Sequence, residues 1–278
     1  MQVFEREAAI RRVVQDCGLQ AKCMALKGFE VNQKGPGDFV TDVDRALDRA
    51  LSQSFADLFP QDGIISEENP DSRPRYQQNP GGRLWCIDPI DGTRDFIETQ
   101  QNYSVMTGLL ENGQPRVGWI FDPAADEMYF GGQDWGLFCQ QGDRVQDCFP
   151  QPPTLMNRVV IGVQDQRNYG ALLQRQIPEI DLWERPGSFG LKILSVILGQ
   201  AGMLVYFNGR VKLWDTVAPV AMARQAGLIC CDLAGNPLSY APDAIELDSL
   251  AHRYPVVIGW KHCIDVFLPR VQAAMAAR

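Results

Sequence analysis

Histidine, positive charge and paired cysteines are scarce in this chain of 278 residues. Its two histidines leave little material for a histidine-based zinc site or a Ser-His-Asp triad. Acidic residues outnumber basic ones by 34 to 26, and the net charge of −8 argues against a polymeric nucleic acid as the main partner. None of the eight cysteines forms a C-x-x-C pair, so neither a zinc ribbon nor a thioredoxin-type motif is present.

Long apolar runs are also lacking. No segment approaches the roughly 18 apolar residues of a membrane span, and residues 1–12 are too charged for a signal peptide. A G-x-x-x-x-G-K-[ST] loop is absent, which disfavours an NTPase or a kinase. We therefore expect a cytoplasmic protein with reduced thiols and no membrane contact. The sequence does not set the oligomeric state, and a homodimer stays open.

Helical and strand-like segments alternate along the chain, which predicts an α/β protein with layered sheets. Apolar residues at helical spacing predict helices over residues 2–26, 41–58, 188–198 and 215–226. Short apolar runs predict strands over residues 63–66, 84–87, 103–110, 116–121, 127–130, 159–163, 203–207 and 228–231. The proline-rich segment 149–153 is the best linker candidate and predicts two lobes, 1–150 and 151–278.

The most informative segment is W-C-I-D-P-I-D-G-T, residues 85–93. A buried strand is expected to end at Asp88, and Asp91 follows three residues later beyond a proline. Gly92 permits close backbone approach, and Thr93 supplies a hydroxyl where a helix can begin. Two carboxylates beside free amides suit a metal ion and a phosphate. A plain strand–turn–helix with Asp91 as the helix cap explains the same residues without catalysis.

Three further segments carry carboxylates, and each has a structural explanation as well. Adjacent Glu67 and Glu68 repel each other unless a cation or solvent separates them, and a solvated acidic loop is the alternative. Asp215 opens an apolar helix, where it can serve as an ordinary N-cap. Thr41 with Asp44 three residues later resembles a capping box, which accounts for both residues without chemistry.

In this order the four segments resemble the magnesium-dependent, lithium-sensitive phosphatase superfamily, whose pattern is D…EE…DPxDGT…WDxxA. That superfamily contains the inositol monophosphatases, the 3′(2′),5′-bisphosphate nucleotidases and the fructose-1,6-bisphosphatases. The resemblance extends from about residue 38 to residue 240. It implies a phosphoric monoester hydrolase with the layered αβαβα sugar-phosphatase fold and a site between two lobes.

The resemblance also assigns roles to individual residues. Two or three Mg²⁺ ions are implied, held by Glu67, Asp88, Asp91, Asp215 and the main-chain carbonyl of Ile90. The implied catalytic set is Asp44, Glu67 and Thr93, of which Thr93 and Asp44 match the pair that orients and deprotonates the attacking water. The amides of Gly92 and Thr93 would hold the phosphate, and no covalent enzyme intermediate is implied.

Substrate selection is expected in the C-terminal lobe. Lys192 is the only charge in an apolar helix and suggests a cation for a second phosphate, although a snorkelling lysine is the alternative. The G-S-x-x-L-K-like run resembles the nucleotidase branch, with one residue more than that pattern has. Asn208 stands where inositol monophosphatases have a glutamate. Expected substrate contacts are Asp91, Gly92, Thr93, Gly187, Ser188, Lys192, Asn208 and Asp215.

The expected partner is therefore a small phosphorylated metabolite, and the expected reaction is conversion of adenosine 3′,5′-bisphosphate to AMP and phosphate. An inositol-1-monophosphatase, or a related sugar or histidinol phosphatase, is the second reading. A third is a non-catalytic binding protein on the same fold.

Overall fold

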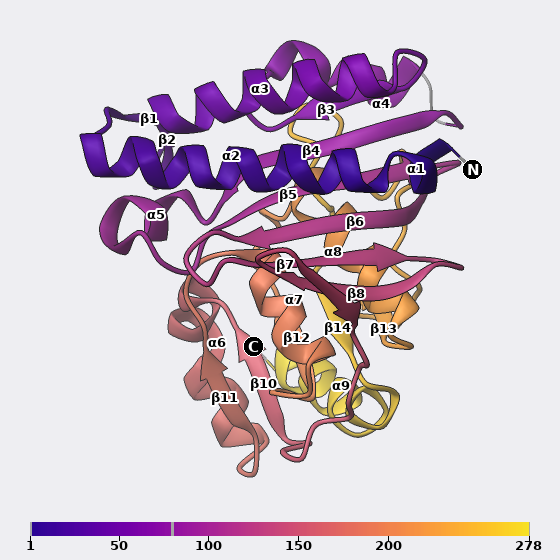
Figure 1. Ribbon diagram of the computed structural model, residues 1–278. Coiled ribbons are helices and arrows are strands. Elements are labelled where there is room, and N and C mark those ends of the chain that lie inside the picture. The colour runs from indigo at the N-terminus through magenta and orange to yellow at the C-terminus, as the bar shows by residue number, and fades with distance from the viewer. Residues whose placement is uncertain (1, 79–80, 278) are drawn as a thin grey trace.

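The computed structural model describes residues 2–78 and 81–277 and stacks helices and sheets in five alternating layers (Figure 1). Helices cover the outer face of a seven-stranded sheet, two helices lie between that sheet and a five-stranded one, and two more cover the far side. The αβαβα layering expected from the sequence is therefore confirmed. Within the described ranges, no helix is long and apolar enough to cross a bilayer.

The outermost layer is formed by the N-terminal helices, α1 (Gln2–Glu5), α2 (Glu7–Lys27) and α3 (Asp42–Leu58). A hairpin of β1 (Val31–Gly35) and β2 (Asp38–Thr41) separates α2 from α3. The apolar faces of α2 and α3 bury a cluster against the sheet that includes Ile10, Val14, Leu47, Phe55, Trp85 and Trp119. Thr41 caps α3 in a complete capping box with Asp44, as the sequence predicts.

The large sheet has the strand order β3-β4-β5-β6-β7-β8-β9, and all neighbours are antiparallel except β3 and β4. Its strands are β3 (Gly63–Ser66), β4 (Arg83–Asp91), β5 (Ser104–Glu111), β6 (Gln114–Asp122), β7 (Glu127–Gly132), β8 (Gly136–Gln141) and β9 (Arg144–Asp147). Short helical segments flank β3 and β4, namely η1 (Pro70–Ser72), α4 (Pro74–Gln78) and α5 (Thr93–Thr99). The sequence did not predict β8 or β9.

Strand β4 corrects one expectation, because it continues through Pro89 to Asp91 instead of ending at Asp88. Asp88 pairs with Met106 and Asp91 with Ser104, so three steps along β4 match two along β5. Residues three apart on a regular strand point to opposite faces of the sheet. The extra residue in this bulge shifts that alternation, so both carboxylates reach the same side.

The small sheet has the strand order β11-β10-β12-β14-β13, with β10 parallel to β11 and β12. Its strands are β10 (Arg158–Ile161), β11 (Asp181–Glu184), β12 (Met203–Tyr206), β13 (Ile229–Asp232) and β14 (Val256–Gly259). The remaining helices are α6 (Val163–Gln176) and α9 (Lys261–Ala276) on its outer face, and α7 (Phe189–Ile197) and α8 (Leu213–Gln225) between the sheets. The expected strand over 159–163 is shorter than predicted, because α6 begins at Val163.

The predicted linker lies where the chain passes from one sheet to the other, between β9 and β10. A single apolar cluster nevertheless joins the two halves. It contains Leu84 and Met106 from the large sheet, Val160 and Leu204 from the small one, and most of α7 and α8. The division into lobes 1–150 and 151–278 stays a prediction.

A pair of glycines lets α8 lie directly on the large sheet. Gly108 in β5 and Gly118 in β6 face each other in the ladder. A Cβ atom at Gly118 would lie 2.4 Å from the Cα of Ala218, and one at Gly108 would lie 2.6 Å from the nitrogen of Ala218. Asp215 lies on the same helix, one turn before Ala218, so this contact sets how far Asp215 stands from β4.

Gly118→Ala should therefore destabilise the protein by about 1–3 kcal/mol, the usual penalty for overpacking a tight contact. Denaturant unfolding would measure this loss. Gly81→Ala is the control, because a Cβ there meets nothing within 4 Å. An unchanged free energy of unfolding for Gly118→Ala would contradict the packing argument.

Candidate active site

Three aspartates meet where α8 crosses the end of β4, two of them from β4 and the third from α8. Asp88, Asp91 and Asp215 each offer one carboxylate oxygen, and these atoms all lie within 4.8 Å of one another. Asp88 is 1% exposed and Asp91 is 8% exposed. Oxygen ligands of this kind suit a hard divalent cation such as Mg²⁺.

Each of the three carboxylates is held by backbone or side-chain donors. Asp215 Oδ2 accepts a 2.6 Å hydrogen bond from the amide of Lys212. Asp88 Oδ1 accepts one of 3.1 Å from the amide of Ile90. Asp91 Oδ2 reaches across to α7, where it accepts from Ser188 Oγ at 2.5 Å and from the amide of Gly190 at 2.9 Å.

The helix containing Asp215 begins two residues earlier than the sequence suggested. Leu213 is the first residue of α8, and Asp215 occupies the third position of its first turn. Asp215 therefore does not cap the helix, although its carboxylate still reaches back to the Lys212 amide. Asp91 is not a cap either, because the position before α5 is Gly92.

The electrostatics of the cluster follow from burial and mutual repulsion. Burial, together with the charges of Asp91 and Glu67, raises the pKa of Asp215 to about 7. Burial and the charges of Glu67, Asp91 and Asp215 raise the pKa of Asp88 well above its ordinary value. Burial also raises the pKa of Asp91, and the hydrogen bonds from Ser188 and Gly190 oppose that rise. A bound cation would offset this repulsion and favour the ionised form of the acids.

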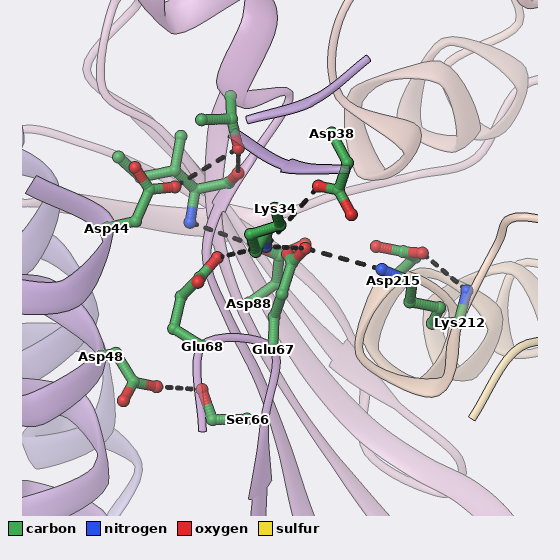
Figure 2. A network of polar contacts seen from close by, with 12 residues as sticks. Lys34, Asp38, Asp44, Asp48, Ser66, Glu67, Glu68, Asp88, Lys212 and Asp215 are labelled. Carbon is green, nitrogen blue, oxygen red and sulfur yellow. Dashed lines mark hydrogen bonds and ion pairs between the residues drawn. The ribbon is translucent and has the colours of Figure 1, made fainter. Parts of the chain in front are cut away.

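The adjacent acids after β3 are not a solvated loop. The side chain of Glu68 is 5% exposed and that of Glu67 is 14% exposed. Lys34 Nζ, from the β1–β2 hairpin, lies 3.0 Å from Glu67 Oε1 and 2.8 Å from Glu68 Oε1 (Figure 2). Lys212 Nζ lies 3.7 Å from the same oxygen of Glu67. Two lysines of the chain therefore balance part of the charge in the acidic site.

Lys34 is a site residue that the sequence analysis missed. Its ammonium also lies 3.7 Å from Asp38 Oδ1 (Figure 2). Although burial lowers the pKa of Lys34, the charges of Glu67 and Glu68 raise it above the ordinary lysine value. Only the fold of the hairpin brings this lysine to the acids, and the sequence has no spacing signal for that contact.

The predicted pair of Thr93 and Asp44 is brought together. Thr93 Oγ1 lies 3.3 Å from Asp44 Oδ1 and 3.1 Å from the carbonyl oxygen of Ile90. Asp44 is 1% exposed, and its Oδ2 accepts a 2.8 Å hydrogen bond from the amide of Thr41. The capping box and the contact with Thr93 therefore use different oxygens of one carboxylate.

Gly92 and Gly187 allow two loops to touch at the site. Gly92 has φ +93°, and a Cβ there would lie 2.9 Å from the nitrogen of Ser188. Gly187 has φ +75°, and a Cβ there would lie 1.9 Å from the carbonyl oxygen of Asn102. Both positions combine a left-handed backbone with no room for a side chain, so glycine is required.

The two residues expected to select the substrate lie in different surroundings. Lys192 is 5% exposed, its ammonium donates to the carbonyl of Gly187, and burial lowers its pKa to about 8. The alternative of a lysine snorkelling to solvent is therefore wrong. Asn208 is half-buried, and its Oδ1 accepts a 3.0 Å hydrogen bond from the amide of Arg210. Contact of either residue with a substrate stays a prediction.

Comparison with known proteins agrees with this geometry. The model of the inositol monophosphatase family matches residues 5–258. The 3′(2′),5′-bisphosphate nucleotidase CysQ of Escherichia coli is 30% identical over 222 residues, which cover 78% of this chain and 85% of CysQ. An inositol-1-monophosphatase of Bacillus subtilis is 23% identical over 243 residues, with 85% and 88% covered. The chain therefore belongs to the inositol monophosphatase family and is a phosphoric monoester hydrolase.

A solved structure supports the fold over nearly the whole chain. An inositol monophosphatase/NADP phosphatase in complex with Mg²⁺ and phosphate superposes with a TM-score of 0.78 at 21% identity. The alignment covers 98% of this chain and 95% of that one. At this identity the likeness establishes the shared architecture alone.

The raised pKa values predict how the metal-free protein responds to pH. Acids whose pKa is higher in the folded than in the unfolded chain bind more protons when folded, so stability falls as pH rises between the ordinary value of 3.8 and about 7. Thermal unfolding in a chelator should give a lower Tm at about pH 7.5 than at about pH 5. Added Mg²⁺ should raise the Tm mainly at the higher pH.

Asp215→Asn provides the control, because it removes the acid whose pKa is raised to about 7. Its Tm should fall less over the same pH interval. A metal-free wild-type protein that is equally stable, or more stable, at the higher pH would contradict this prediction.

Proposed function

We propose that the protein is a Mg²⁺-dependent phosphomonoesterase that removes the 3′-phosphate of adenosine 3′,5′-bisphosphate, giving AMP and phosphate. The proposal depends above all on the three aspartates, two buried and one half-buried, whose oxygens lie within 4.8 Å of one another. The contact of Thr93 with Asp44 supports it, since it places a hydroxyl and a carboxylate together beside Ile90.

The residues present fit a divalent cation, because their donors are oxygens and the two nearby lysines balance only part of their negative charge. In this proposal two or three Mg²⁺ ions are held by Glu67, Asp88, Asp91, Asp215 and the carbonyl of Ile90. Bound Mg²⁺ would supply positive charge for the phosphate and lower the pKa of water.

The chain's own groups then act on the water and the ester. Thr93 Oγ1 would orient the water, and the carboxylate of Asp44 would take its proton, because the two side chains already lie 3.3 Å apart. Glu67 completes the proposed catalytic set. The amides of Gly92 and Thr93 are proposed to hold the phosphate oxygens.

Two observations favour a nucleotide over inositol phosphate as the substrate. Similarity to the nucleotidase CysQ reaches 30% identity, against 23% for the inositol-1-monophosphatase. Asn208 replaces an acid that would accept hydrogen bonds from inositol hydroxyls, and losing such a buried contact reduces discrimination by orders of magnitude. Inositol 1-phosphate is the second candidate, because CysQ-like and inositol-specific relatives both match over most of the chain.

The remaining expectations belong to the same proposal. These are a small phosphorylated metabolite as partner, a cytoplasmic location and inhibition by Li⁺ at one cation position, while a homodimer stays open. A non-catalytic binding protein is disfavoured, because every residue of the D…EE…DPxDGT…WDxxA pattern is present.

Asp88→Asn should reduce turnover by roughly 10²-fold or more, as for the loss of one preorganised electrostatic group. Asn is nearly isosteric, so the fold should persist. Steady-state rates at saturating Mg²⁺ would measure the effect, with Asp57→Asn on the exposed face of α3 as the control. Near-wild-type turnover of Asp88→Asn would contradict its role as a ligand.

A phosphate-release assay tests the substrate. Adenosine 3′,5′-bisphosphate should give the highest kcat/KM in a panel with its sulfated relative, inositol 1-phosphate, fructose 1,6-bisphosphate and histidinol phosphate. A preference for inositol 1-phosphate would replace the nucleotide assignment by the second candidate. Absence of Mg²⁺-dependent release from every ester would favour a binding protein.

A further inference from the structure

Ser104 is a buried polar residue that neither the sequence motifs nor the family pattern singles out. It is the first residue of β5, it pairs directly with Asp91 in the ladder, and its exposed fraction is 0%. Its hydroxyl lies 2.8 Å from Ser188 Oγ, which is itself 0% exposed. A chain of contacts therefore leads from β5 through the N-cap of α7 to the carboxylate of Asp91.

The direction of these hydrogen bonds follows from counting protons. A serine hydroxyl has one proton to donate and two lone pairs that accept. The amide of Leu191 donates to Ser188 Oγ at 3.0 Å, and Ser188 gives its own proton to Asp91 Oδ2 at 2.5 Å. The contact between the two hydroxyls must therefore use the proton of Ser104. Ser188 is then fully satisfied and has no alternative partner.

This arrangement anchors Asp91 through its Oδ2 atom. Oδ2 accepts from Ser188 Oγ and from the amide of Gly190, so both of its donors come from the start of α7. A carboxylate anchored through one oxygen in this way has a defined orientation when it binds a cation through the other. If the Ser188 hydroxyl were free to rotate, that orientation would be lost.

We propose that Ser104 is a positioning residue for Asp91: by donating to Ser188, it directs the Ser188 hydroxyl onto Asp91 Oδ2 and presents Oδ1 to the metal. The inference rests on the metal-dependent hydrolysis proposed above, but not on the identity of the ester. Ser104 thereby connects β5 to the Asp91–Ser188 contact, which by itself joins only β4 and α7.

Ser104→Ala tests this role against simple packing, with binding of Mg²⁺ alone followed by titration calorimetry. Partners that orient a metal ligand typically contribute about 10–100-fold to affinity, so we expect the Kd for Mg²⁺ to rise about tenfold. The Mg²⁺ concentration for half-maximal activity should rise by the same factor. At saturating Mg²⁺, kcat should stay within about twofold of wild type, because the ligand itself remains.

Ser195→Ala is the matched control. Ser195 is 2% exposed, and its hydroxyl donates to the carbonyl of Lys192 at 2.6 Å, so the variant also removes a buried hydroxyl and one hydrogen bond. It should lower the Tm about as much as Ser104→Ala but leave the Kd for Mg²⁺ unchanged. Equal Kd values for wild type and Ser104→Ala would overturn the proposal, as would an equal rise in both variants.

Ser104→Cys replaces Ser104→Ala in the test if the alanine variant does not fold. The thiol fills the space of the hydroxyl but is a weaker hydrogen-bond donor. Its Kd for Mg²⁺ should lie above that of wild type, and an unchanged value would again overturn the proposal. A wild-type protein that binds no Mg²⁺ would overturn both this inference and the proposed function. Normal Mg²⁺ binding and turnover in wild type, with no effect at Ser104, would overturn this inference alone.

Discussion

Repulsion between buried acids is the constraint on which the arrangement of the site depends. Asp88, Asp91 and Asp215 are brought within 4.8 Å of one another in surroundings that disfavour their charged forms. Such a cluster destabilises the folded state unless rigid elements hold the carboxylates and a cation neutralises their charge. The fold supplies that rigidity through the bulge in β4 and through a helix that packs directly on the sheet.

The two sheets are connected at the site as well as through the core. Asp91 closes β4, yet its hydrogen-bond donors belong to the first turn of α7 between the sheets. Gly92 and Gly187 bring the corresponding backbones into contact. A shift of α7 relative to the large sheet would therefore change the geometry of a proposed metal ligand. Packing between the layers and ligand geometry are coupled in this protein.

Much of this could be predicted from the sequence. The layered α/β class and the capping box at Thr41 followed from apolar periodicity and local spacing. The proximity of Thr93 to Asp44 and the cluster of three aspartates followed from the family resemblance. The first two features depend on local spacing, whereas the last two depend on the order of four motifs that the whole family shares. The predicted contacts with phosphate and substrate await the experiments described above.

Features that depend on tertiary register could not be predicted. The bulge in β4 appears only when its pairing with β5 is known, and Lys34 reaches the acids only through the fold of the hairpin. Strand β9 is exposed throughout and lacks an apolar alternation, while α6 is too polar to indicate a helix by periodicity. Helix α9 contains Pro269, which ordinarily argues against a helix interior.

The lysine of the β1–β2 hairpin has a consequence for how tightly the site holds its ion. Lys34 already forms ion pairs with Glu67 and Glu68, at 3.0 and 2.8 Å. A divalent ion that binds Glu67 competes with the Lys34 ammonium for the same carboxylate. Metal binding would therefore weaken or displace an existing ion pair. The affinity for the metal ion then depends on the difference between the interaction of Glu67 with that ion and its interaction with Lys34. A change at Lys34, which lies 33 or more residues from every proposed ligand in the sequence, would therefore alter the ion concentration at which the site fills.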